Sequence, residues 1–103
     1  MTEKELRLIG LGMRAGSVLV GTSRVREGLK KEQIRLVVLA GDFSKRTEEK
    51  VGRLARAKGV RIIEGPGSIE LGRRVGRKPV QALGLLDANL ASEIGSADKA
   101  ESR

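Results

Sequence analysis

The sequence contains no cysteine, histidine, tryptophan or tyrosine, and Phe43 is its single aromatic residue. Without cysteine and histidine, the chain cannot form disulfide bonds, the usual zinc sites, a thiol nucleophile or an imidazole base. No apolar run approaches the roughly 20 residues that a membrane-spanning helix requires. The charged start MTEKELRL also differs from the apolar stretch of a signal peptide. We therefore expect a soluble, cytoplasmic protein.

The sequence also offers little for catalysis. Asp42, Glu64, Glu70 and Asp87 are the carboxylates near expected strand ends or turns. Asp42 and Asp87 stand where helix caps are needed. Because nothing assembles a nucleophile, a base and an orienting group, we predict no enzyme, no cofactor, no metal site and no small-molecule substrate.

Positive charge is present in excess. Lysine and arginine number 21 against 13 acidic residues, which gives a net charge of +8. The charges of residues 96–103 cancel, so the excess belongs to residues 1–95, which we predict to be one domain followed by a disordered polar tail. A basic folded surface favours a polyanion, above all a nucleic acid. Solubility alone is the competing explanation for this charge.

The hydrophobic pattern alternates helices with short strands. Thr2 and Glu5 have the spacing of a capping box, and Thr22 or Ser23, Ser44 and Ser68 are expected to cap later helices. The expected helices cover residues 2–15, 22–31, 45–58, 68–75 and 88–94, and the expected strands cover 17–20, 34–40, 60–63 and 80–87. This alternation predicts an α/β fold with helices on both faces of a small sheet.

The corner at Gly21 is the first candidate binding feature. A strand that ends in glycine and leads into a helix presents free backbone N–H groups, which favour an anion such as phosphate. Thr22 and Ser23 add hydroxyl groups at this point. The competing interpretation is structural, because every strand-to-helix turn needs a small residue and a cap.

The helix that follows carries two rows of charge. Arg24, Glu27 and Lys31 share one exposed row, in which Glu27 is expected to pair with both cations. Arg26 and Lys30 form a second row without an acidic partner at helical spacing. They are therefore the freer candidates for binding phosphate.

Further along, LGRRVGRKP carries Arg73, Arg74, Arg77 and Lys78 with no acidic residue among them, which favours a polyanion patch over an ordinary solvated surface. The stretch GPGS, with Gly65, Gly67 and Ser68, matches no nucleotide-binding fingerprint. We interpret it as a turn with a capping serine.

The segments MRAGSVLVG, LVVLAGDFS, KGVRII and ELGRRVGR resemble, in order and spacing, the kink-turn RNA-binding ribosomal proteins of the L-seven-Ae and L-thirty-e type. The chain resembles in particular the small bacterial members of the YlxQ type, and the resemblance covers about residues 4 to 94. It implies a three-layer α/β/α sandwich around a mixed four-stranded sheet. It also implies RNA binding by the start of the second helix and the adjacent loops.

The chain departs from the family's contact motif. Of the four contact positions, only Gly21 is retained, Ser23 stands for an asparagine, and Arg24 and Glu27 exchange the family's glutamate and lysine. Ser23 offers one short hydroxyl where an amide would offer both a donor and an acceptor. Because Phe43 is the only ring, backbone and shape recognition are favoured over stacking on bases.

The sequence thus predicts a monomeric, non-catalytic protein that binds structured RNA, either ribosomal or another noncoding species, and that could act on the ribosome. The alternative is a protein-interaction module of the translation or transcription machinery that has lost kink-turn specificity. The predicted RNA-binding residues are Gly21, Thr22, Ser23, Arg24, Arg26, Glu27, Lys30, Gly65, Gly67, Ser68, Arg77 and Lys78.

Overall fold

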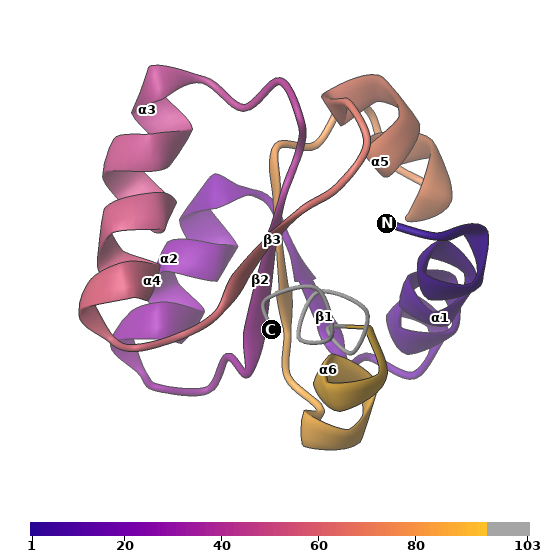
Figure 1. The fold of residues 1–103 in the computed structure, drawn as a ribbon, viewed down its shortest axis with the longest axis horizontal. Helices are drawn as coiled ribbons and strands as arrows, with labels where there is room; N and C mark the ends of the chain where they lie inside the picture. Colours follow the sequence, from indigo (N-terminus) through magenta and orange to yellow (C-terminus); the bar gives the residue numbers. More distant parts are fainter. Residues whose placement is uncertain (95–103) are drawn as a thin grey trace, which may run out of the picture.

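A mixed four-stranded sheet forms the middle of the structure, a computed structural model that describes residues 1–94 (Figure 1). The expected polar tail at 96–103 lies outside this part. The strand order is β1-β4-β2-β3, with β4 antiparallel to β1 and β2, and β3 parallel to β2. The strands are β1 (Val18–Val20), β2 (Leu36–Leu39), β3 (Ile62–Glu64) and β4 (Ala82–Leu85).

Helices cover both faces of the sheet, which confirms the three-layer α/β/α sandwich. One layer contains α2 (Thr22–Lys30) and a continuous helical run made of α3 (Lys45–Thr47), the π-helical turn η1 (Glu48–Gly52) and α4 (Arg53–Ala57). The other layer contains α1 (Glu3–Arg14), α5 (Ser68–Arg74) and α6 (Ala88–Ile94). Within residues 1–94, no helix is both long and apolar enough to cross a membrane.

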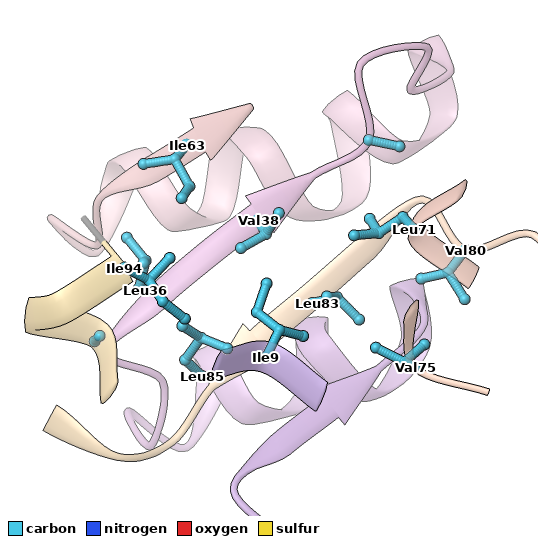
Figure 2. Close-up of a cluster of buried hydrophobic side chains, with 12 residues drawn as sticks. Ile9, Leu36, Val38, Ile63, Leu71, Val75, Val80, Leu83, Leu85 and Ile94 are labelled. Carbon is cyan, nitrogen blue, oxygen red and sulfur yellow. The ribbon is translucent and has the colours of Figure 1, made fainter. Parts of the chain in front are cut away.

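The interior strands separate two apolar cores. All four residues of β2 are buried, and their side chains alternate between the faces, as expected for a strand covered on both sides. Leu36 and Val38 join the core beneath α1, α5 and α6, which Figure 2 shows with Ile9 and Leu83. Val37 and Leu39 join the core beneath α2 and α4.

The helix ends follow local chemistry only in part. The capping box of Thr2 and Glu5 is present, and Ser44 accepts a hydrogen bond from the Thr47 N–H. The predicted caps at Thr22, Ser23 and Ser68 are wrong, because α2 is capped by Gly21 and α5 by Gly67. Both glycines occupy the N-cap position and offer no side-chain acceptor, so Thr22, Ser23 and Ser68 lie inside the helices and not at their caps.

The helix predicted at 45–58 contains a π-turn. The Arg53 N–H bonds to the Glu48 carbonyl, five residues back, so one extra residue is accommodated between α3 and α4. The hydrophobic spacing alone did not indicate this insertion. It shifts the residues after Gly52 around the helix axis and still buries Val51 and Ala55.

Candidate nucleic-acid interface

Four loops meet at one end of the sheet, the upper end in Figure 1. Because β1, β2 and β3 run in the same direction and β4 runs against them, three strands end where β4 begins. The Gly21 N–H donates to the Ala82 carbonyl (2.9 Å), and the Gly65 N–H donates to the Leu39 carbonyl (2.8 Å). We call this region the loop surface, formed by residues 21–24, 40–44, 65–68 and 76–81.

Gly21 places the start of α2 in the loop surface. Its φ of 101° and ψ of 153° lie in a region that is essentially restricted to glycine. A Cβ at this position would meet no other described atom within 4 Å, so the backbone here faces open space. Within residues 1–94 no side chain caps α2, and the N–H groups of its first turn remain available to solvent or an anion.

Replacing Gly21 with alanine is expected to lower the free energy of unfolding by about 1–3 kcal/mol, because alanine is strained in this conformation. It should also weaken RNA binding by reshaping the start of α2. Gly16→Ala is the control, since Gly16 also has a positive φ (75°) and open space, but lies at the other end of β1. It should cost about 1–2 kcal/mol and leave binding unchanged. Thermal unfolding measures the stability of both variants, and RNA titration measures their affinity. Equal losses of RNA affinity in the two variants would exclude a special role for Gly21.

The GPGS turn is held by Asp42 from a neighbouring loop. The Ser68 N–H donates to Asp42 Oδ1 (2.8 Å), and Ser68 Oγ donates to Oδ2 (3.2 Å). The Gly41 N–H donates to the Pro66 carbonyl (2.8 Å). Asp42 therefore caps α5, and not the helix that follows it in the sequence.

Gln81 is a structural residue of the loop surface that the sequence pattern did not indicate. Its Oε1 accepts hydrogen bonds from the Ser44 N–H (2.8 Å) and from Thr47 Oγ1 (2.6 Å). These bonds tie the start of β4 to the start of α3. The one sequence feature that could have indicated this role is the side-chain amide of Gln81 directly before an apolar strand.

Arg77 and Lys78 lie on the loop between α5 and β4 and are exposed, as the sequence predicted. The Arg77 N–H donates to the Gly72 carbonyl (2.8 Å), and the Val80 N–H donates to the Ser68 carbonyl (3.0 Å). A Cβ on Gly72 would overlap the Lys78 carbonyl oxygen. The absence of a side chain at Gly72 therefore allows this loop to lie against α5.

In the other half of the predicted cationic patch, Arg73 and Arg74 are paired with carboxylates, so they are less available to a polyanion than the sequence indicated. Arg74 donates two hydrogen bonds to Glu3 (2.6 Å each) and one to Glu70 (2.9 Å), and Arg73 bonds to Glu70 (3.3 Å). The hydrogen bond from Arg74 holds the pKa of the Glu3 carboxyl below its ordinary value. Glu3 is 71 residues away in sequence, so local spacing could not reveal this partner.

Three predicted residues of α2 are placed differently from our expectation. Arg26 is not free, because its Nη1 donates to the Lys50 carbonyl (2.8 Å). Lys30 is the last residue of α2, about 12 Å along the helix from Thr22. Among the described residues, Glu27 has no ion pair with Arg24 or Lys31, although all three side chains are exposed.

The structure thus brings most of the predicted site together at one end of the sheet. Phe43 also lies there, but it is half-buried against the core beneath α2 and α4. Its ring therefore packs against the core and is poorly placed to stack on a nucleic-acid base. Within residues 1–94, no three acidic groups are placed to hold a metal ion. The predicted site residues gathered in the loop surface are Gly21, Thr22, Ser23, Arg24, Gly65, Gly67, Ser68, Arg77 and Lys78.

Solved structures with a similar fold include a protein of unknown function from Bacillus halodurans. It matches with a TM-score of 0.86 and 25% identity, over 92% of this chain and 96% of that one. A 15.5kD RNA binding protein of Giardia lamblia matches with a TM-score of 0.75 and 21% identity, over 97% of this chain and 92% of that one. The second likeness concerns the fold alone.

Relatives are also similar in sequence. The RNA-binding protein YlxQ of Enterococcus faecium is 30% identical over 88% of this chain and 87% of its own. The large ribosomal subunit protein eL30 of Methanocaldococcus jannaschii is 32% identical over 92% of this chain and 88% of its own. The model of the ribosomal protein L7Ae/L30e/S12e/Gadd45 family matches residues 4–94. The chain therefore belongs to the ribosomal protein L7Ae/L30e/S12e/Gadd45 family.

Proposed function

We propose that this protein binds structured RNA through its loop surface, as a monomer and without catalysis. The observation that carries the proposal is the uncapped start of α2 at Gly21, on the same surface as the exposed cations Arg24, Arg77 and Lys78. Backbone N–H groups and unpaired cations together suit phosphate oxygens. The relative YlxQ is named an RNA-binding protein, and eL30 a ribosomal subunit protein, which supports the same partner.

The chemistry of the loop surface favours recognition of phosphates and shape. Phe43 is half-buried, and the chain has no other ring on which a base could stack. Ser23 offers a single hydroxyl to a base edge. The unpaired carboxylate of Glu27 would repel nearby phosphates, so the closest contacts fall to Arg24 and the backbone of the first turn.

A titration of fluorescent kink-turn RNA against a plain duplex of equal length, each at two salt concentrations, tests the proposal. We expect both RNAs to bind, with affinities within about tenfold and a steep fall with salt, because each phosphate contact releases counterions. A preference for the kink-turn above about a hundredfold would show that Ser23, Arg24 and Glu27 form a working variant of a base-reading site. Failure to bind either RNA at near-physiological salt would contradict the proposal.

One observation favours the alternative, a module that binds protein. Ile69, the second residue of α5, is 63% exposed beside the loop surface, and an exposed apolar side chain suits a protein contact. The net charge and the available N–H groups of α2 weigh against this alternative. Pull-down of a partner protein that persists at high salt and after ribonuclease treatment would favour it.

A further inference from the structure

The positive charge of the protein is distributed unequally between its two helical layers. The layer made of α2, α3, η1 and α4 carries eight lysine and arginine residues against three glutamates. The layer made of α1, α5 and α6 carries five against four glutamates. We call the outer face of the first layer the cationic helical layer (residues 22–30 and 45–57).

Ion pairs widen the difference between the two layers in the number of unpaired cations. In the opposite layer, Glu3 and Glu70 engage Arg7, Arg73 and Arg74. In the cationic helical layer, Glu48 pairs with Arg56 and so neutralises a single cation. Six exposed cations of this layer have no acidic partner among the described residues, namely Arg24, Lys30, Lys45, Arg46, Lys50 and Arg53.

The π-turn helps to build this face. Because Gly52 has no side chain, the Glu48 carboxylate lies over it and reaches Arg56. The hydrogen bond from Arg26 Nη1 to the Lys50 carbonyl holds α2 against the helical run. Val51 and Ala55 point into the core. Arg46, Lys50 and Arg53, spaced four and three apart, are left on the exposed side.

We infer that the cationic helical layer is a second RNA-contacting surface, which binds the phosphates of a double-helical RNA segment adjoining the RNA at the loop surface. This inference rests on the proposed function and extends it. The two surfaces are continuous, because α2 and α3 both begin at the loop surface (Figure 1), with Arg24 in the first turn of α2 and Lys45 as the first residue of α3. Lys30, which lies far from the loop surface, thereby also faces the RNA.

The composition of this face favours a duplex over other polyanions. The large apolar side chains that are exposed within residues 1–94 are Met1, Leu11 and Ile69, and all three lie outside the cationic helical layer. A helical face that binds a membrane surface needs apolar anchors beside its cations. Cations without exposed large apolar side chains among them instead suit the sequence-independent phosphate contacts made to a duplex.

The test uses two RNAs with the same bent core, one with short arms and one with an arm lengthened by a helical turn. The variant Arg46→Gln/Arg53→Gln removes two charges, seven residues apart, from the cationic helical layer. Arg7→Gln/Arg14→Gln removes two charges at the same spacing from α1, in the opposite layer. All four side chains are exposed, so we expect the melting temperatures to stay close to that of the wild type.

We expect the first variant to bind the long-armed RNA about tenfold to a hundredfold more weakly. The slope of log affinity against log salt should fall by about two, and binding of the short-armed RNA should not change. The α1 variant should match the wild type on both RNAs. Equal losses in the two variants, or no loss in the first, would overturn the inference while leaving the proposed function intact.

Two further outcomes test whether the partner is RNA or a lipid surface. If the wild type binds neither RNA, both the inference and the proposed function are overturned. If the wild type binds vesicles of anionic phospholipid more tightly than the long-armed RNA, and Arg46→Gln/Arg53→Gln weakens that binding, the face recognises a lipid surface and the inference is again overturned.

Discussion

Replacing Arg24, Arg77 and Lys78 together with glutamine is expected to weaken RNA binding by about two to three orders of magnitude at roughly 0.1 M salt. The three side chains are exposed on the loop surface, and none has an acidic partner among the described residues. Each is therefore free to neutralise a phosphate and release a counterion. The slope of log affinity against log salt should fall by about three.

Stability should be nearly unaffected by the same change. Exposed substitutions away from caps, cavities and buried pairs usually alter the free energy of unfolding by less than about 0.5 kcal/mol. The backbone of this loop is held by the Arg77 N–H and the Val80 N–H, whose bonds do not depend on the side chains replaced. A drop in affinity at an unchanged melting temperature would therefore locate the contact at the loop surface.

The matched control removes three charges from the other end of the sheet. Arg14 ends α1, Lys31 follows α2 and Arg35 precedes β2, so all three lie away from the loop surface. Glutamine at these positions lowers the net charge by the same amount and should reduce affinity only slightly, through long-range attraction. An equal loss in both triple variants would show that net charge, and not the loop surface, determines RNA binding.

Local signals predicted those parts of the fold whose stabilising contacts are close in sequence. The capping box at Thr2 and Glu5 joins residues three apart, and the apolar run of β2 reports burial on both faces directly. Both features are present in the structure. The layered architecture followed from them, because alternating helices and strands leave few ways to bury apolar faces.

Contacts between distant residues were not predictable in the same way. Arg26 donates to a carbonyl 24 residues away, and Arg74 donates to a carboxylate 71 residues away, so neither of these partners stands at helical spacing. Arg74 has a second partner, Glu70, which does stand at helical spacing, four residues before it. Asp42 caps a helix that begins 26 residues later. The Lys50 partner of Arg26, the Glu3 partner of Arg74 and the capping by Asp42 all join elements far apart in sequence, so local spacing does not reveal them. The pairs of Glu70 with Arg73 and Arg74 are local, and they were missed because Glu70 lies outside the cationic stretch 73–78.

The variant Gly72→Ala is expected to impair both folding and RNA binding, although it changes no charge. An added Cβ would overlap the Lys78 carbonyl oxygen and approach the Arg77 carbonyl oxygen at 3.1 Å, and both are backbone atoms. Alanine within a helix is favoured over glycine by about 1 kcal/mol. Overpacking costs about 1–3 kcal/mol, and disturbing the bond from the Arg77 N–H to Gly72 costs about 1 kcal/mol more. The clash therefore prevails, with a net loss of stability on the order of 1–3 kcal/mol.

Displacement of this loop also moves Arg77 and Lys78 away from the other walls of the loop surface, so RNA affinity should fall by about tenfold even where the protein remains folded. Gly10→Ala in α1 is the control, because its nearest neighbour, the Arg74 carbonyl oxygen, lies at an ordinary 3.7 Å. That variant should keep its affinity and gain up to about 1 kcal/mol of stability. Measuring both variants below their melting temperatures separates loss of the folded state from loss of the binding geometry. Wild-type affinity in Gly72→Ala would mean that the position of this loop is immaterial to RNA binding, and that Arg77 and Lys78 act only through their charge.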